Sequence, residues 1–180
     1  MPAPPSSEFL FVTVGTTLAP FDRLIHASED LLSLGMDIVV QRGPSRVSPQ
    51  GVTVVDVLDY PSFLAHMRSA AVVVGHAGIG TTGLAVKYGR PLVVVPRLAS
   101  EGEAVDDHQL HYSRVLAARG LGVAIEDMSK LADAVLTAKA PELHSRTRDY
   151  LATALRAAIL EGTTRDLRHS RRLSSHPNRG

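Results

Sequence analysis

Short apolar runs alternate with longer amphipathic stretches along most of the chain. The apolar runs are rich in valine, leucine and isoleucine, as buried strands are. They predict strands at 9–14, 36–41, 52–57, 70–74, 92–95 and 121–125. Between them, apolar residues recur at helical spacing, which predicts helices at 20–35, 61–69, 80–88, 105–119, 128–139 and 141–160. Gly35, Gly120 and Gly162 stand where three of these helices should end.

This alternation of strands and helices favours an α/β fold. We expect residues 1–162 to form one domain, a Rossmann-like parallel sheet with helices on both faces. The strand at 92–95 should lie beside the strand at 70–74 and parallel to it. In open sheets of this kind ligands bind outside the carboxyl ends of the strands. The residues that follow these two strands are therefore expected to reach one crevice.

Two turns that contain glycine follow predicted strands. Gly15 precedes Thr16 and Thr17 after the first strand, and Gly78 and Gly80 follow the strand at 70–74. Glycine lets the backbone approach a ligand where a Cβ would collide, and the start of a helix offers free N–H groups and a positive dipole end. Together the turns predict an anion site, which a diphosphate would fit. The alternative is that both are plain strand-to-helix connections.

Other phosphate and hydrolase motifs are poorly supported. The glycines at 78, 80 and 83 have the spacing of a dinucleotide fingerprint. However, the next strand ends in Val95-Pro96-Arg97, without the acidic residue that would bind a ribose. The chain has neither the Gly-Lys-Ser/Thr of a Walker loop nor Gly-x-Ser-x-Gly.

No cofactor or metal is expected. The chain has no cysteine, so it can form neither a disulfide nor a thiolate metal site. The candidate ligands for a metal are His76, His108 and His111, with Asp106 and Asp107 nearby. Side chains of these types more often have structural or hydrogen-bonding roles than a metal-binding role.

Charge is unevenly distributed, although the net charge is only +1 and gives no support for nucleic-acid binding. Residues 163–180 hold five arginines and one acid, which leaves 14 basic and 17 acidic side chains elsewhere. We expect this segment to be a disordered basic tail; contact with an anionic membrane surface or an acidic partner is the alternative. No apolar run approaches the ~20 residues of a membrane span, and residues 1–8 do not resemble a signal peptide. The protein is expected to be cytoplasmic.

Five motifs in order resemble one family. They are VTVGTT at 12–17, FDRLI at 21–25, GHAGIGTT at 75–82, PLVVVPR at 91–97 and DDHQ at 106–109. Over residues 9–140 the chain resembles the C-terminal, donor-binding domain of family 28 glycosyltransferases. More narrowly, it is similar to the free-standing Alg13-type and PssE-type subunits. The resemblance implies the donor-binding half of a GT-B enzyme, whose acceptor site lies on a separate, membrane-associated chain of the Alg14 or PssD type.

The resemblance also implies a UDP-sugar site. The two glycine turns would hold the diphosphate, backbone groups at Leu58 would read the uracil, and the segment at 107–109 would contact the sugar hydroxyls. Helix dipoles and backbone donors, with no metal, would stabilise the departing UDP. The expected donor-binding residues are Gly15, Thr16, Thr17, Leu58, His76, Ala77, Gly78, Gly80, Thr81, Arg97, Asp107, His108 and Gln109. No catalytic residue is assigned, because the base of such enzymes comes from the acceptor half.

One position departs from the family pattern. Relatives often have a glutamate on the helix after the second glycine turn, where it holds the ribose hydroxyls, and the alignment puts Leu84 there. Leucine accepts no hydrogen bond, so donor binding could lose on the order of 1–3 kcal/mol. A neighbouring group could compensate, donor affinity could be weak without the partner, or the nucleotide could be held differently.

The resemblance thus implies the donor-binding subunit of a two-chain inverting glycosyltransferase. It would be a UDP-sugar-dependent hexosyltransferase that acts on a lipid-linked (polyprenyl diphosphate) saccharide in exopolysaccharide or glycan biosynthesis. It would be active only with its partner, which would hold it peripherally at the inner face of the membrane, and the helix at 141–160 would form much of the interface. The alternative is a non-catalytic nucleotide-sugar-binding module. An epimerase-like enzyme carries both GT-B halves in one chain, which 180 residues are not expected to hold.

Overall fold

The computed structural model describes residues 4–5 and 8–142. The chain divides into two units, Met1–Glu142 and Leu143–Gly180. The basic tail expected at 163–180 lies outside the described residues, as does nearly all of the helix expected at 141–160. The domain boundary at 162 therefore stays a prediction.

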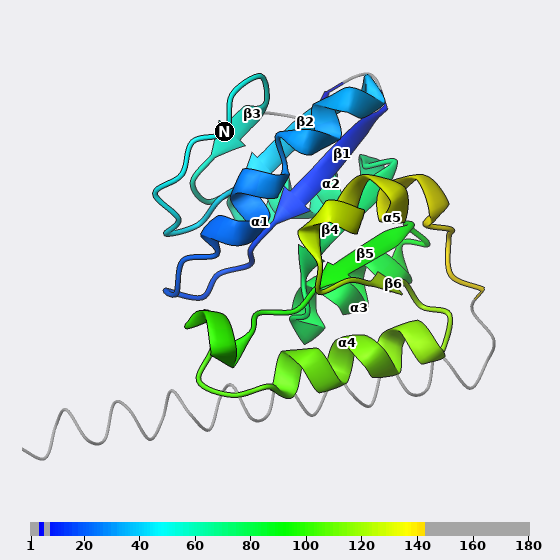
Figure 1. The fold of residues 1–180 in the computed structure, drawn as a ribbon. Helices are drawn as coiled ribbons and strands as arrows, with labels where there is room; N and C mark the ends of the chain where they lie inside the picture. Colours follow the sequence, from blue (N-terminus) through cyan, green and yellow to red (C-terminus); the bar gives the residue numbers. More distant parts are fainter. Residues whose placement is uncertain (1–3, 6–7, 143–180) are drawn as a thin grey trace, which may run out of the picture. The chain divides into compact units, whose positions relative to one another are not determined.

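Six parallel strands form the sheet of the first unit (Figure 1). They are β1 (Phe9–Thr13), β2 (Asp37–Gln41), β3 (Thr53–Val55), β4 (Val72–His76), β5 (Leu92–Val95) and β6 (Val123–Ala124). Their order across the sheet is β3-β2-β1-β4-β5-β6, and every adjacent pair is parallel. This is the order of the Rossmann fold, so the predicted fold class is confirmed. The order reverses between β1 and β4, which places a ligand crevice outside the carboxyl ends of these two strands.

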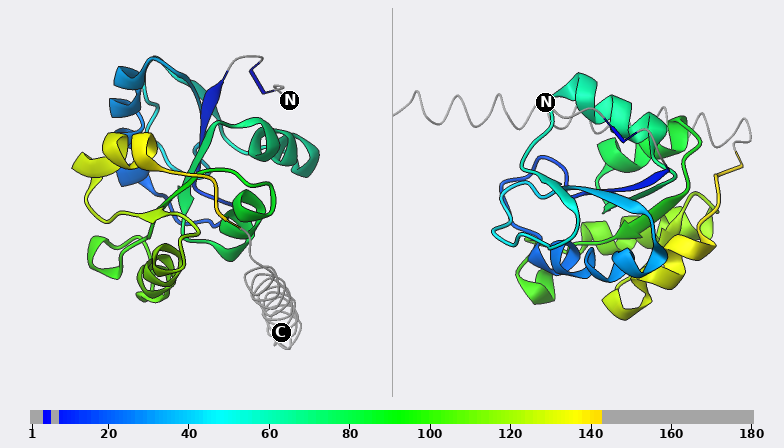
Figure 2. Two further views of the ribbon diagram at one scale, coloured as in Figure 1. Left: turned by 90° about the vertical axis from the view of Figure 1, so that its right-hand side faces the viewer. Right: turned by 90° about the horizontal axis from the view of Figure 1, so that it is seen from above.

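Helices cover both faces of the sheet (Figure 2). The elements are α1 (Asp22–Ala27), α2 (Tyr60–Ser69), α3 (Ile79–Lys87), α4 (His108–Ala118) and α5 (Leu131–Thr137), with 3₁₀ turns η1 (Asp30–Leu34), η2 (Ala99–Glu101) and η3 (Met128–Lys130). The views show α1 and α5 on one face and α2 and α3 on the other. The α4 helix contacts α3 through a hydrogen bond of 2.9 Å between the hydroxyls of Tyr112 and Thr82.

The central strand β1 is buried on both faces, which explains its unbroken apolar run. Leu10 and Val12 belong to the core cluster that includes the apolar residues of α1 and α5. Phe9 and Phe11 point the other way and contact the ring of His66 in α2. Because side chains alternate along a strand, one run supplies apolar residues to two layers of packing.

The elements predicted up to residue 139 are confirmed in order, most of them with shifted ends. The helix expected at 20–35 is divided into α1 and η1, and it stops as expected at Gly35, whose φ of 69° is left-handed. The strand expected at 70–74 runs from 72 to 76, so His76 is its last residue and does not lie in the turn. These shifts are within the usual uncertainty of element boundaries.

The helix expected at 105–119 begins only at His108. The residues before it form a loop in which the Glu103 carboxylate accepts hydrogen bonds from the Leu98 N–H (3.0 Å) and from Arg23 of α1 (2.8 Å). Val105 is fully exposed, so it buries none of its surface against the described residues. Tertiary hydrogen bonds therefore decide where this helix starts. None of the helices within the described ranges is long and apolar enough to cross a membrane.

Candidate functional site

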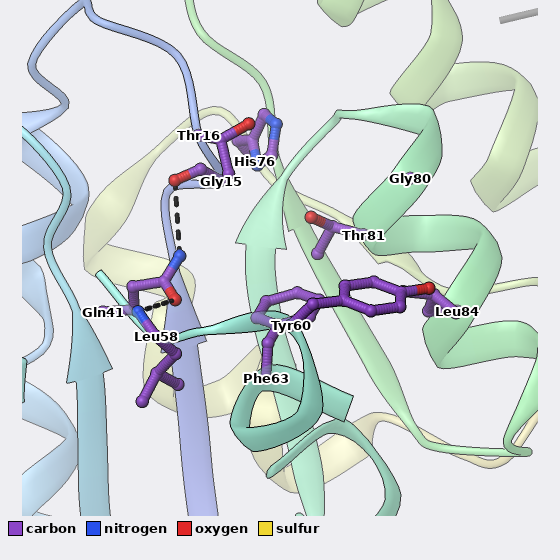
Figure 3. Close-up of a pocket in the computed structure, with 10 residues that line it drawn as sticks. All are labelled: Gly15, Thr16, Gln41, Leu58, Tyr60, Phe63, His76, Gly80, Thr81 and Leu84. Atoms are coloured by element: carbon purple, nitrogen blue, oxygen red, sulfur yellow. Dashed lines mark hydrogen bonds between the residues drawn. The ribbon is translucent and has the colours of Figure 1, made fainter. Parts of the chain in front are cut away.

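A cavity of about 340 Å³ opens at the carboxyl edge of the sheet (Figure 3). It is lined by residues at the ends of β2 and β4 and by the segments that follow β1, β3 and β4. The lining residues are Gly15, Thr16, Gln41, Leu58, Tyr60, Phe63, His76, Gly80, Thr81 and Leu84. The cavity therefore lies at the crevice that the strand order predicts, where β1 and β4 meet.

The first glycine turn can be made only by glycine. Gly15 has a φ of 75°, which side-chain-bearing residues rarely adopt, and an added Cβ would collide with the imidazole of His76. Its N–H donates to Thr13 Oγ1 at 3.2 Å. A side chain of the preceding strand thus stabilises the turn. The next residues, Thr16 and Thr17, are exposed.

The imidazole of His76 fills the space between the two glycine turns. A Cβ on Gly78 would also lie closer to this ring than 3.0 Å. The ring therefore occupies the space that a side chain at position 15 or 78 would need. His76 is 9% exposed, and its Nδ1 has no hydrogen-bond partner among the residues that the structure describes. Burial, and secondly the charge of Arg97, lower the pKa of His76 from 6.5 to about 4, against an opposing effect of the Thr13 carbonyl. At neutral pH the ring is therefore uncharged.

The second turn leads into α3, whose N-terminus supplies free backbone donors. Gly78 occupies the N-cap position without a side-chain cap. The N–H groups of Ile79, Gly80 and Thr81 make no hydrogen bond to any described residue. Gly80 and Thr81 line the cavity, so the positive end of the helix dipole opens there. A Cβ on Gly80 would meet nothing within 4 Å, which leaves this space to a ligand.

The other end of the cavity is mainly apolar. Leu58, Tyr60, Phe63 and Leu84 line it, and the cavity lining contains no carboxylate (Figure 3). The Leu58 N–H donates to Gln41 Oε1 at 3.2 Å. Leu58 can therefore offer a base only its carbonyl, which accepts no hydrogen bond within the described part of the chain. Of the backbone groups at Leu58 that were expected to bind the base, only the carbonyl is therefore available.

Arg97 lies beneath the first glycine turn. It is 2% exposed, and its guanidinium donates to the carbonyls of Pro20 (2.7 Å) and Val14 (3.4 Å). It also stacks on the ring of Phe21, 4.6 Å from the ring centre. Arg97 does not line the cavity. Its hydrogen bonds stabilise the backbone on either side of the first glycine turn, and its charge adds positive potential near that turn.

The segment at 107–109 lies outside the cavity lining. The Asp107 carboxylate accepts from the Ala99 N–H (3.3 Å), and the Gln109 side-chain carbonyl accepts from the Arg97 N–H (3.2 Å). His108 is exposed and pairs with the Asp106 carboxylate at 2.7 Å. These residues begin α4 after β5, so they lie at the same edge of the sheet as the cavity.

The structure brings together six of the predicted site residues in the cavity lining: Gly15, Thr16, Leu58, His76, Gly80 and Thr81. Thr17, Ala77, Gly78, Arg97, Asp107, His108 and Gln109 do not line it. Sequence reasoning missed Gln41, Tyr60 and Phe63. A polar residue at the end of the apolar strand β2 was the available signal for Gln41. No group of three or more His, Cys, Asp or Glu side chains that could hold a metal ion occurs in residues 8–142.

The chain belongs to glycosyltransferase family 28. The family model of the glycosyltransferase family 28 C-terminal domain matches residues 9–159. Glycosyltransferase GtfE of Amycolatopsis orientalis is 28% identical over 151 residues, which are 81% of this chain and 35% of that protein. The chain thus spans about a third of the length of this curated relative.

Solved glycosyltransferases have a similar fold. The glycotransferase of kitacinnamycin superposes with a TM-score of 0.57 at 20% identity, over 72% of this chain and 34% of that one. The glycosyltransferase SsfS6 of a Streptomyces species, crystallised in complex with thymidine diphosphate, is 26% identical with a TM-score of 0.50, over 76% of this chain and 39% of that one. The chain is therefore a Rossmann-like domain of the GT-B type.

Proposed function

We propose that this domain binds a UDP-sugar and is the donor-binding half of an inverting glycosyltransferase. The observation that carries the proposal is the meeting of two features at one cavity. The glycine turn after β1 and the unpartnered amides at the start of α3 face the same space, beside a Gly80 that leaves room for a ligand. Such amides and a helix N-terminus bind phosphate groups well.

The same features would assist the reaction. When the sugar leaves, negative charge develops on the diphosphate, and donors that are already in place stabilise it without reorganisation. The α3 amides, the α3 dipole and the buried charge of Arg97 all favour an anion at the glycine turns. His76 is uncharged at neutral pH, so it would act toward the diphosphate as a neutral hydrogen-bonding group.

We further propose that an acceptor-binding partner subunit of the Alg14 or PssD type covers the mouth of the cavity. Leu18, Val57, Tyr60 and Val105 are among the most exposed large apolar residues of the described chain, with exposed fractions from 57% to 101%. They lie in the segments that follow β1, β3 and β5, all at the carboxyl edge of the sheet. Exposed apolar side chains gathered at a site's rim favour a protein partner there.

Through this partner the domain would be held at the inner face of the membrane. The acceptor proposed is a lipid-linked (polyprenyl diphosphate) saccharide of polysaccharide or glycan biosynthesis, in line with the resemblance to free-standing subunits. The segment at 141–160 is proposed to form much of the subunit interface. Truncation after Lys139 should then abolish co-purification with the partner, and unchanged co-purification would contradict this assignment.

A non-catalytic nucleotide-sugar-binding module is the second candidate, and Leu84 favours it. Leu84 lines the cavity, and no carboxylate there can accept hydrogen bonds from ribose hydroxyls. Weak donor binding is compatible with a sensor, or with a subunit that binds its donor only in the complex.

Two experiments test the proposal. Calorimetric titration with UDP, UDP-GlcNAc, UDP-glucose and UDP-glucuronate should show binding, and the ranking should indicate the sugar. An equimolar mixture with the partner should then transfer sugar to a lipid-linked acceptor, while neither chain does so alone. Absence of binding to all four ligands, with and without the partner, would refute donor binding. If a UDP-sugar binds but the mixture transfers no sugar, the non-catalytic nucleotide-sugar-binding module is favoured.

A further inference from the structure

Gln41 connects the two ends of the cavity. It is the last residue of β2, the strand between β1 and β3, and it is 1% exposed. Its Nε2 donates to the Gly15 carbonyl at 3.3 Å and to Thr13 Oγ1 at 3.2 Å. Its Oε1 accepts from the Leu58 N–H at 3.2 Å (Figure 3). One amide therefore holds the glycine turn after β1 and the loop after β3.

The orientation of this amide is unambiguous. A backbone N–H can only donate and a backbone carbonyl can only accept, so Oε1 must face Leu58 and Nε2 must face Gly15. Both amide hydrogens are used within the protein, by Gly15 and Thr13. Gln41 thus acts on a ligand mainly through the two loops that it holds.

The two loops belong to opposite ends of the site. The strands that precede them are two strand spacings apart, roughly 10 Å. The glycine turn is at the polar, anion-binding end, and Leu58 is at the apolar end with Tyr60 and Phe63. Within residues 8–142, Gln41 is the residue whose side chain hydrogen-bonds to both Gly15 and Leu58.

We propose that Gln41 is a positioning residue. It holds the base-binding loop at a defined separation from the diphosphate-binding turn, so that a nucleoside diphosphate contacts both ends at once. This rests on the proposed donor-binding function. An anion without a base needs only the glycine turns and α3, and Thr13 still holds the Gly15 N–H when Gln41 is absent. Loss of Gln41 should therefore weaken nucleotide binding more than pyrophosphate binding.

The test uses the full chain with Gln41→Met, which keeps the length of the side chain and removes its polar atoms. UDP and inorganic pyrophosphate are titrated by calorimetry. We expect Gln41→Met to weaken UDP binding about tenfold and pyrophosphate binding less than threefold, since two buried hydrogen bonds to the loops are lost. Gln50→Met is the matched control, because Gln50 is exposed and lies in the loop between β2 and β3. It should leave the ratio of the two dissociation constants unchanged.

The ratio of the UDP and pyrophosphate dissociation constants separates positioning from general destabilisation. General destabilisation would weaken the binding of both ligands by the same factor. Equal weakening of both ligands in a folded Gln41→Met protein, or no change in either, would overturn the inference. If Gln41→Met does not fold, Gln41→Asn keeps a buried amide but is one methylene too short to reach both the Gly15 carbonyl and the Leu58 N–H, and it leaves the bond between Thr13 and the Gly15 N–H in place. It should also weaken UDP binding more than pyrophosphate binding, and an unchanged ratio of the two dissociation constants would overturn the inference. A wild-type protein that binds pyrophosphate but not UDP would overturn the donor-binding proposal itself.

Discussion

Replacing Gly80 with alanine should weaken UDP binding without destabilising the fold. Gly80 lies in the first turn of α3, its φ is not positive, and an added Cβ would meet nothing within 4 Å. Alanine is more favourable than glycine within a helix by about 0.5–1 kcal/mol, so the free energy of unfolding should rise slightly or stay constant. The new methyl group would occupy the space that the structure leaves open beside the α3 amides.

The expected loss of affinity follows from the contact that is displaced. A hydrogen bond to a charged group contributes about 1.5–3 kcal/mol, so moving a phosphate away from one α3 amide should weaken UDP binding about ten- to a hundredfold. Isothermal titration calorimetry measures the dissociation constant, and thermal unfolding checks stability. Gly80→Val, with a larger side chain, should weaken binding further.

Gly78→Ala provides the contrast. Its Cβ would collide with the His76 ring, so this variant should lose stability, unlike Gly80→Ala. The pair distinguishes a glycine needed for a ligand from a glycine needed for a neighbouring side chain. If Gly80→Ala folds normally and binds UDP with an unchanged dissociation constant, the diphosphate does not lie at the start of α3, and the proposed site is wrong.

Three further variants test the charges and the ribose end of the site. The pKa of His76 is about 4 in the folded protein and 6.5 in the unfolded chain, so the stability that the neutral ring contributes is present above pH 6.5 and is lost as the pH falls toward 4, by on the order of 3 kcal/mol. In denaturant titrations His76→Gln should therefore lose less unfolding free energy than the wild type between pH 6.5 and pH 4. An equal loss in the two proteins would contradict the lowered pKa. Arg97→Met should raise the pKa of His76, as measured by NMR of its ring protons, and should cost about 2–3 kcal/mol of unfolding free energy, because the carbonyls of Pro20 and Val14 lose a charged donor. Leu84→Glu should increase the preference for UDP over thymidine diphosphate about tenfold, because a carboxylate can accept from the ribose 2′-hydroxyl; equal gains for both nucleotides would contradict this placement of the ribose.

Much of the fold could be read from local pattern. Apolar runs of four to six residues separated by helical stretches predicted an α/β sheet, and the structure confirms six parallel strands. The strand at Leu92–Val95 was predicted to the residue, since Pro91 and Pro96 bound it. Gly35 and Gly120 were expected to end helices, and both have positive φ. Each of these features depends on residues that are neighbours in the chain.

The glycine turns were also visible in the sequence, but their reasons were not. Sequence reasoning treated the glycines as one group that brings backbone close to a ligand. The structure separates them: Gly15 and Gly78 make room for His76, whereas Gly80 leaves open space. The space beside Gly15 is occupied by His76, which lies 61 positions further along the chain. No local sequence pattern contains that information.

Long-range hydrogen bonds decided the remaining features. Arg97 follows a strand and was expected to contact the donor, yet its guanidinium is used by the carbonyls of Pro20 and Val14. The Gln41 side chain reaches both Gly15 and Leu58 because β2 lies between β1 and β3. The sequence by itself determined the fold class, the family and the two turns, because burial periodicity and glycine chemistry are local. The tertiary structure alone decided which polar groups are already paired and which are left for a ligand, because that depends on the order of strands across the sheet.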